Sequence, residues 1–195
     1  EPFAGVVFKT VIDPFVGKLS FFKVTAGKLT KGEVYNVTRE TSEKVGSLFT
    51  LRGKEQLEIS EAHAGDIAVV AKLSVTETGD TLCDKAHPIQ YKAVKFQEPV
   101  LFFAIEPKSK GDEDKIGSAL AKLTEEDPTL VMDRNQETGQ LLIGGQGDTQ
   151  LAVVMEKLKD LYNVEVERVP LRIAFRETIK STASVQGRHK KQTGG

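Results

Sequence analysis

The spacing of apolar residues changes once along this chain, near residues 89–98, and that change constrains the fold more than any other feature. Before it, short runs rich in Val and Phe are separated by turn residues at intervals of roughly 8 to 12 positions, which is typical of all-β domains. After it, apolar runs alternate with stripes of helical period. The length of 195 residues allows two modules of roughly 80 to 100 residues each. The sequence therefore predicts two separate hydrophobic cores.

Residues 1–88 are predicted to form a small all-β barrel. The β-rich runs occupy residues 4–12, 17–26, 32–38, 44–51 and 66–73. No window of this half keeps an apolar face of helical spacing over the length of a helix. Strands this short would leave exposed edges in an open sheet, and closure removes such edges, so we expect a closed barrel. Cys83, the only cysteine, has no disulfide partner and is expected to pack as a small buried residue.

The second module, residues 99–168, begins with a strand and a helix. The continuous apolar run 100–105 is typical of a strand buried on both faces. Acids at 112–114 favour the start of a helix because they meet the positive end of its dipole. Asp127 and Pro128 end this helix, since the residue before a proline avoids helical geometry. Its predicted apolar face comprises Ile116, Ala119, Leu120 and Leu123.

Two short strands, a second helix and a last strand complete this module. Residues 129–134 and 140–144 are the strands of a hairpin, because the loop 135–139 is short and carries glycine. The helix starts near Asp148, and a strand follows at 164–168. The helix stripe comprises Leu151, Val154, Met155, Leu158, Leu161 and Tyr162. The order strand, helix, strand, strand, helix, strand predicts an α+β ferredoxin-like βαββαβ domain with both helices on one face of a four-stranded sheet.

A polar connector at 89–98 and a C-terminal segment at 169–195 flank this module. The segment is predicted to be a further strand at 170–185 followed by a basic, glycine-bounded loop. Because the chain starts at Glu1 and stops after that loop, we expect an internal piece of a longer polypeptide, ending inside another domain. No apolar run approaches about 18 residues and no signal peptide is visible. We therefore expect a soluble, cytoplasmic protein.

The charges are distributed unevenly along the chain. Residues 1–97 carry 13 Lys and Arg against 12 Asp and Glu, residues 98–168 carry 8 against 15, and residues 169–195 carry 6 against 1. The second module is therefore acidic (8 − 15 = −7) and the C-terminal segment basic (6 − 1 = +5). Because acidic charge repels phosphate at long range, contact of the second module with nucleic acid must come from particular loops.

No catalytic or metal site is visible in the sequence. Glycines at 144, 145 and 147 precede a helix, but the Lys and hydroxyl residue of a phosphate-binding loop are missing, so Gly147 is expected to free the backbone for a turn. The acids at 112–114 point in different directions around a helix and form no chelating face. The three histidines lie far apart without zinc-ligand spacing. We expect no catalytic residue, metal or cofactor in this chain.

Several strings resemble elongation factor G, a translational GTPase. In the first half these are DPFVGKLSFFKV at 13–24, AGDI at 64–67 and GDTLCD at 79–84. In the second half they are EPVLFFAIEPKSKGDEDK at 98–115, ALAKLTEEDPTL at 119–130, ETGQLLIGG at 137–145, FRETI at 175–179 and GRHKKQTGG at 187–195. They are similar to the second and third domains of the family and the opening of the fourth.

The resemblance implies a factor that binds the ribosome and, driven by GTP hydrolysis, moves transfer RNA and messenger RNA. It implies that the barrel contacts small-subunit ribosomal RNA, and that the third domain relays between the nucleotide domain, a small-subunit ribosomal protein and the tip domain. GTP and Mg would bind in a nucleotide domain that precedes the barrel, so this chain, a monomer without membrane contact, would have no GTPase activity. The candidate ribosome-binding residues are Lys18, Lys23, Lys108, Lys110, Arg188, Lys190 and Lys191.

One stretch departs from the family pattern. Where the family usually has a string like GMGELHL, this chain has GQGDTQL at 145–151, with Gln150 in place of His. In the family this stretch lies near the nucleotide domain and the fusidic acid site, so the residues resembling that site are Gly147, Asp148, Gln150 and Leu151. The resemblance therefore implies a weak response to fusidic acid. It favours a divergent paralogue, with a tetracycline-resistance ribosomal protection protein as the alternative.

A free-standing RNA-binding protein is a rival from another class. Such proteins present stacked aromatic residues on a ferredoxin-like sheet. Here Phe102 and Phe103 are adjacent in a strand whose two faces are both apolar, and no [KR]-G-[FY]-x-F string occurs, which disfavours this reading. A hydrolase would need a constellation that the sequence does not show.

Overall fold

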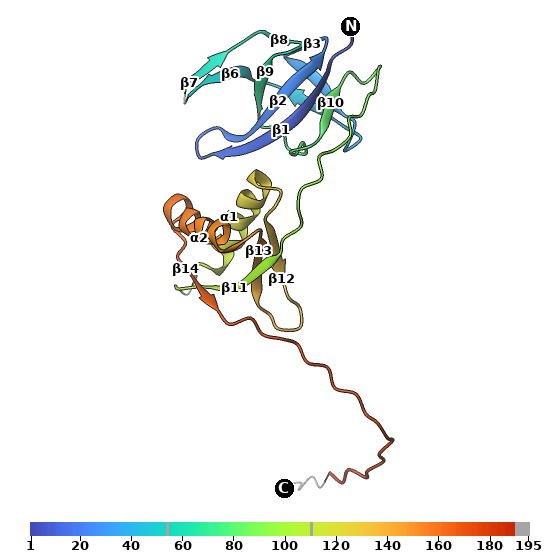
Figure 1. Cartoon of the computed structure of the whole chain (residues 1–195), viewed down its shortest axis with the longest axis vertical. Coiled ribbons are helices and arrows are strands. Elements are labelled where there is room, and N and C mark those ends of the chain that lie inside the picture. The colour runs from blue at the N-terminus through green and yellow to red at the C-terminus, as the bar shows by residue number, and fades with distance from the viewer. Residues whose placement is uncertain (54, 110, 190–195) are drawn as a thin grey trace, which may run out of the picture.

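The structure, a computed structural model, describes residues 1–53, 55–109 and 111–189. Two units follow one another along the chain, the first built of strands and the second of strands and helices (Figure 1). Residues 84–100 join them without helix or strand, so the connector is longer than the expected 89–98. Among the described residues, every hydrophobic cluster belongs to one unit alone, so each unit has a core of its own.

The first unit is an antiparallel barrel-type domain. Its strands are β1 (Ala4–Asp13), β2 (Gly17–Ala26), β3 (Lys28–Thr30), β4 (Gly32–Asn36), β5 (Thr41–Val45), β6 (Leu48–Arg52), β7 (Glu55–Glu58), β8 (Glu61–His63), β9 (Ile67–Ala71) and β10 (Thr81–Cys83). Eight of them form one sheet in the order β5-β4-β10-β1-β2-β9-β6-β7, and β3 pairs with β8. Phe22, Leu48 and Leu82 lie fully buried between them, and Cys83 is buried as expected.

Full closure of this barrel by hydrogen bonds is not observed. Within the described ranges β5 and β7 are the two edges of the eight-stranded sheet and do not pair with each other. The core nevertheless combines residues from strands throughout the unit, including Leu29 of β3 and Ala62 of β8. The sheet therefore curls around one core, with the small β3–β8 sheet packing against it, and side-chain packing completes what the hydrogen-bond ladder leaves open.

A carboxylate fixes the loop that precedes β10. Glu43 of β5 accepts hydrogen bonds from the backbone N–H groups of Ser74, Val75 and Thr76, the last two at 2.9 and 3.0 Å. The hydroxyls of Ser74 and Thr76 also donate to it. Burial disfavours the charged form, but the hydrogen bonds outweigh burial and hold the pKa of Glu43 below its ordinary value.

The barrel should lose stability when acid protonates Glu43. Because the folded pKa is depressed, the stabilisation is complete above the unfolded value of about 4.3 and is lost as the pH falls through the folded value. Glu43→Gln should cost roughly 1 to 2 kcal/mol at neutral pH and should weaken the acid dependence. Urea melts over a pH series test this, with Glu33→Gln, an exposed glutamate of β4, as control. Equal acid dependence in Glu43→Gln and wild type would contradict the assignment.

The second unit has the predicted ferredoxin-like order. Its elements are β11 (Leu101–Pro107), α1 (Glu113–Glu126), β12 (Val131–Arg134), β13 (Leu141–Gly145), α2 (Asp148–Tyr162) and β14 (Val166–Val169). The sheet order is β12-β13-β11-β14, with all neighbours antiparallel. The predicted face of α1 is buried, and so are Leu151, Val154 and Leu158 of α2. Leu161 was expected in the α2 stripe but is 63% exposed, because it lies on the side of the last turn away from the sheet.

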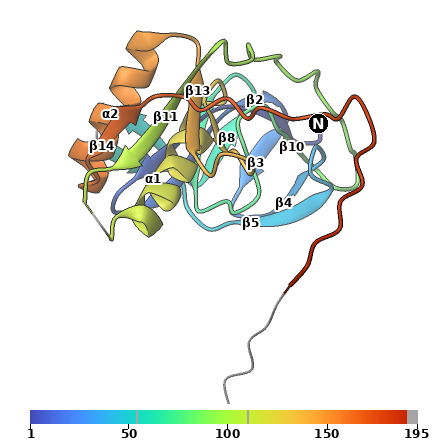
Figure 2. The same cartoon turned by 90° about the horizontal axis from the view of Figure 1, so that it is seen from below.

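Strand β11 is not buried on both faces as predicted. Phe103 and Ile105 pack against the helices, whereas Phe102 points to the opposite face of the sheet and is 40% exposed. Its ring lies over Gly144 of the paired strand, where a Cβ would come within 2.5 Å of the ring. An apolar run predicts burial of both faces only if a second layer exists, and both helices of this unit lie on one face (Figure 2).

The C-terminal segment does not form the predicted strand at 170–185 within the described residues. Figure 1 shows it running away from the sheet, and its apolar side chains Leu171, Ile173 and Phe175 are exposed. A single extended segment has no partner for its backbone hydrogen bonds, so alternation alone does not produce a strand. Among the residues that the structure describes, no helix is long and apolar enough to cross a membrane.

Candidate functional site

The two predicted barrel lysines lie on β2 in different surroundings. Lys23 is exposed. The side chain of Lys18 is only 14% exposed, and its Nζ lies 3.3 Å from Oε2 of Glu125 on α1. Lys18 therefore joins the barrel to the second unit, and of the two lysines Lys23 is the one that can reach a phosphate without breaking an ion pair.

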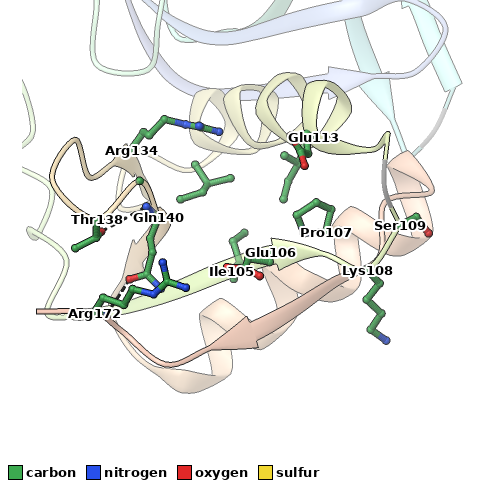
Figure 3. Close-up of a pocket in the computed structure, with 13 residues that line it drawn as sticks. Ile105, Glu106, Pro107, Lys108, Ser109, Glu113, Arg134, Thr138, Gln140 and Arg172 are labelled. Atoms are coloured by element: carbon green, nitrogen blue, oxygen red, sulfur yellow. Dashed lines mark hydrogen bonds between the residues drawn. The ribbon is translucent and has the colours of Figure 1, made fainter. Parts of the chain in front are cut away.

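Lys108 lies at the rim of a cavity of about 420 Å3 between the end of β11, the start of α1 and the β12–β13 hairpin (Figure 3). Its side chain points away from the cavity, and its Nζ lies 3.3 Å from Oε2 of Glu165. Lys159 lies 3.2 Å from the other oxygen of the same carboxylate. Hydrogen bonds from Lys159 and Lys108 lower the pKa of Glu165. Lys108 is thus exposed but shares its charge with an acid.

The cavity also gathers two arginines that sequence reasoning did not connect, Arg134 and Arg172. Buried Gln140 positions Arg172: its Nε2 donates to the carbonyl of Pro170 at 2.9 Å, and its Oε1 accepts the backbone N–H of Arg172 at 2.8 Å. Neither arginine has an ion-pair partner in the described ranges. The glutamates Glu106 and Glu113 line the same cavity, so its charge is mixed and favours no simple anion or cation.

The basic tail does not join Lys108 in one surface within the described part of the chain. Arg188 is exposed and lies in the segment that runs away from the sheet (Figure 1). Lys110, Lys190 and Lys191 lie outside the described residues. Their assignment to ribosome binding stays a prediction from sequence.

The divergent stretch 145–151 forms the end of β13 and the start of α2. Gly147 precedes the helix with φ 170°, extended backbone that any residue adopts, so the expected need for glycine freedom is wrong. Asp148 is exposed, with Oδ1 3.7 Å from Nη1 of Arg168. Leu151 is fully buried in the core beneath the helices. Only part of this stretch is therefore available to a partner or a drug.

Gln150 joins three segments of the second unit. Its Oε1 accepts the backbone N–H of Gln146 at 2.6 Å, and its Nε2 donates to Oδ2 of Asp127 and Oγ1 of Thr129, both at 2.8 Å. Gln146 in turn donates to the backbone carbonyls of Gln97 and Glu98 at 3.1 and 2.9 Å. The chain of amides thus runs from the end of α1 to the connector between the two units.

Asp127 is held ionised by this network. Burial opposes its charge, but hydrogen bonds from Thr129 and Gln150 outweigh burial and lower its pKa. A neutral glutamine donates one N–H to Asp127 and another to Thr129 without titrating near neutral pH. The stretch therefore works here as a fixed hydrogen-bonded joint.

The described residues hold no group of three or more His, Cys, Asp or Glu that could bind a metal ion. His63 contacts Glu61 at 3.0 Å, and His87 lies 3.8 Å from Asp84, so each has a local partner and they do not meet in a site. What the structure brings together is instead a contact between the two units, formed by the β1–β2 hairpin and the last turn of α1. Sequence reasoning missed this contact, because residues far apart in the chain carry no shared local pattern.

Comparison with known families decides the identity of both units. The profile of Elongation factor G domain 2 matches residues 2–85, and that of Elongation Factor G, domain III matches residues 96–170. The chain belongs to the elongation factor G family. A crystal structure of a protein from Thermus thermophilus is 33% identical, with a TM-score of 0.77 over 89% of this chain. The chain spans 26% of the length of that protein.

The two matches place the barrel as domain II and the ferredoxin-like unit as domain III of an elongation factor G-like protein. The Gln150 network lies inside domain III, at the end of the sheet from which α2 starts. The glutamine therefore departs from the family string at a position that is hydrogen-bonded to Gln146, Asp127 and Thr129, rather than at a side chain surrounded by solvent.

Proposed function

We propose that this chain is the ribosome-binding central segment of an elongation factor G-like GTPase that promotes movement of transfer RNA and messenger RNA. The observation that carries the proposal is the match of domain II and domain III in order along one chain. In this proposal the barrel meets small-subunit ribosomal RNA, and domain III transmits the effect of GTP hydrolysis toward a tip domain. A relay must be joined to its neighbours, and the ties of domain III to the barrel hairpin and to the connector support that role.

Ribosome binding tests this function directly. The chain should cosediment with ribosomes and show no measurable affinity for free single-stranded RNA, because no stacked aromatic platform is exposed on the described domain III sheet apart from Phe102. The opposite result, tight binding to short single-stranded RNA without ribosome binding, would favour the free-standing RNA-binding protein.

The chain by itself should bind no guanine nucleotide. Neither a phosphate-binding loop nor an NKxD string occurs in its 195 residues, and backbone N–H groups of such a loop are what hold the phosphates. Calorimetric titration with GTP and Mg should give no heat of binding, and GTP hydrolysis should stay absent when ribosomes are added. Micromolar binding would show a nucleotide site that lacks these motifs.

We also propose that a longer protein containing this chain responds weakly to fusidic acid, because Gln150 replaces the usual His and is engaged inside domain III. A divergent elongation factor G paralogue is the reading that the 33% identity and the two domain matches support.

A further inference from the structure

The last turn of α1 carries charges that are wrong for an isolated helix. Glu125 and Glu126 occupy this turn, and it contains no basic residue. The C-terminal end of a helix is the negative end of its dipole, where an acid costs about 0.3 to 1 kcal/mol instead of stabilising. These two acids therefore need partners outside α1.

Both partners come from the tip of the barrel hairpin. The backbone N–H of Ile12 donates to Oε1 of Glu126 at 2.8 Å. Lys18, paired with Ile12 in the β1–β2 ladder, places its Nζ 3.3 Å from Oε2 of Glu125. Glu126 also lies 3.8 Å from Lys157 of α2, so it connects the hairpin to both helices of domain III. Figure 1 shows the hairpin directly above these helices.

Little else holds the two domains in this orientation. No hydrophobic cluster in the described ranges combines residues from both domains. Two open crevices flank the contact, one of about 500 Å3 beside Ile12 and Tyr162 and one of about 300 Å3 beside Thr78 and Pro128. A packed apolar interface resists tilting because every side chain is fixed by its neighbours. A polar contact bordered by crevices does not.

We propose that Glu125 and Glu126 form an ionic latch that sets the orientation of domain III on the barrel and opens when its charges are screened or removed. The connector, tied to domain III through Gln146, is the hinge about which the domains move when the latch is open. The latch is a property of the free chain and is independent of ribosome binding. Its strength depends on salt, because partly exposed ion pairs weaken as the screening length shortens.

Interdomain distances measured by double electron–electron resonance test the latch. Spin labels at Glu55→Cys in β7 and Asp160→Cys in α2 lie at exposed positions of the two domains, and the natural Cys83 is buried. The wild-type chain should give a narrow distance distribution at low salt that broadens at about 1 M salt, where the screening length is about 3 Å. E125Q/E126Q should give the broad distribution at low salt.

The control E113Q/D114N removes the same charge from the other end of α1, where neither residue has an ion-pair partner among the described residues, and should keep the narrow distribution. K18Q breaks the latch from the barrel side, so it decides the question even if E125Q/E126Q unfolds domain III. The charge exchange K18E/E125K should restore the narrow peak. A distribution unchanged in both E125Q/E126Q and K18Q would overturn the proposal.

Discussion

Leu158→Ala should destabilise domain III by about 2 to 5 kcal/mol. Leu158 is fully buried on α2, in the cluster that also contains Phe103, Ile105 and Leu120. Removing its side chain loses the transfer free energy of the deleted groups and leaves a cavity that the surrounding strands and helices fill only in part. Because typical domains are stable by only about 5 to 15 kcal/mol, this loss is a large share of the total.

Urea denaturation followed by NMR signals of domain III measures this change without interference from the barrel. Leu161→Ala is the matched control: it makes the same chemical change three residues further along α2, at a side chain that is 63% exposed. Its effect should stay below about 0.5 kcal/mol, as for ordinary surface positions. Similar effects of the two substitutions would mean that the buried side of α2 is assigned incorrectly.

Binding of the chain to ribosomes should be weak and should fall steeply with salt. For irregular or single-stranded RNA the slope of log affinity against log salt is about −0.7 per phosphate contact, so three or four contacts give about −2 to −3. Affinity should then fall about 16- to 60-fold between 50 and 200 mM salt. The expected contributors are Lys23 on the barrel and the basic tail, since Lys18 and Lys108 already face carboxylates.

Filter binding to small subunits across a salt series checks this expectation. Replacing Arg188, Lys190 and Lys191 together by Gln should flatten the slope. Replacing the acids at 112–114 by their amides should leave the slope nearly unchanged or strengthen binding, because it removes repulsion and no contact. A slope untouched by the triple substitution would show that the tail makes no phosphate contact.

Much of the architecture could be read from local pattern. Period 2 and turn spacing predicted the barrel strands, and the order of apolar runs and helical stripes predicted the βαββαβ domain, because these patterns state which side of an element avoids water. The α1 face from Ile116 to Leu123 is buried as predicted. The hairpin after Arg134 formed where expected, with Asn135 accepting the N–H groups of Glu137 and Thr138 at 3.0 Å.

Local pattern failed where the neighbour of a surface decides its fate. Phe102 stayed exposed because no second layer covers its face of the sheet among the described residues, and Leu171 to Phe175 stayed outside any sheet because no described strand lies beside them. Lys18 looked like a free cation in sequence, yet it faces Glu125, a residue 107 positions further along the chain (125 − 18).

The sequence by itself determined the two apolar patterns, the element order and the family, because each depends on residues close together in the chain or on strings read directly. Tertiary structure alone decided which charges remain free, how Gln150 joins α1 to the connector, and how the hairpin meets Glu126. These depend on distances between side chains of separate segments, and such distances exist only after both cores have packed and the connector has set one against the other.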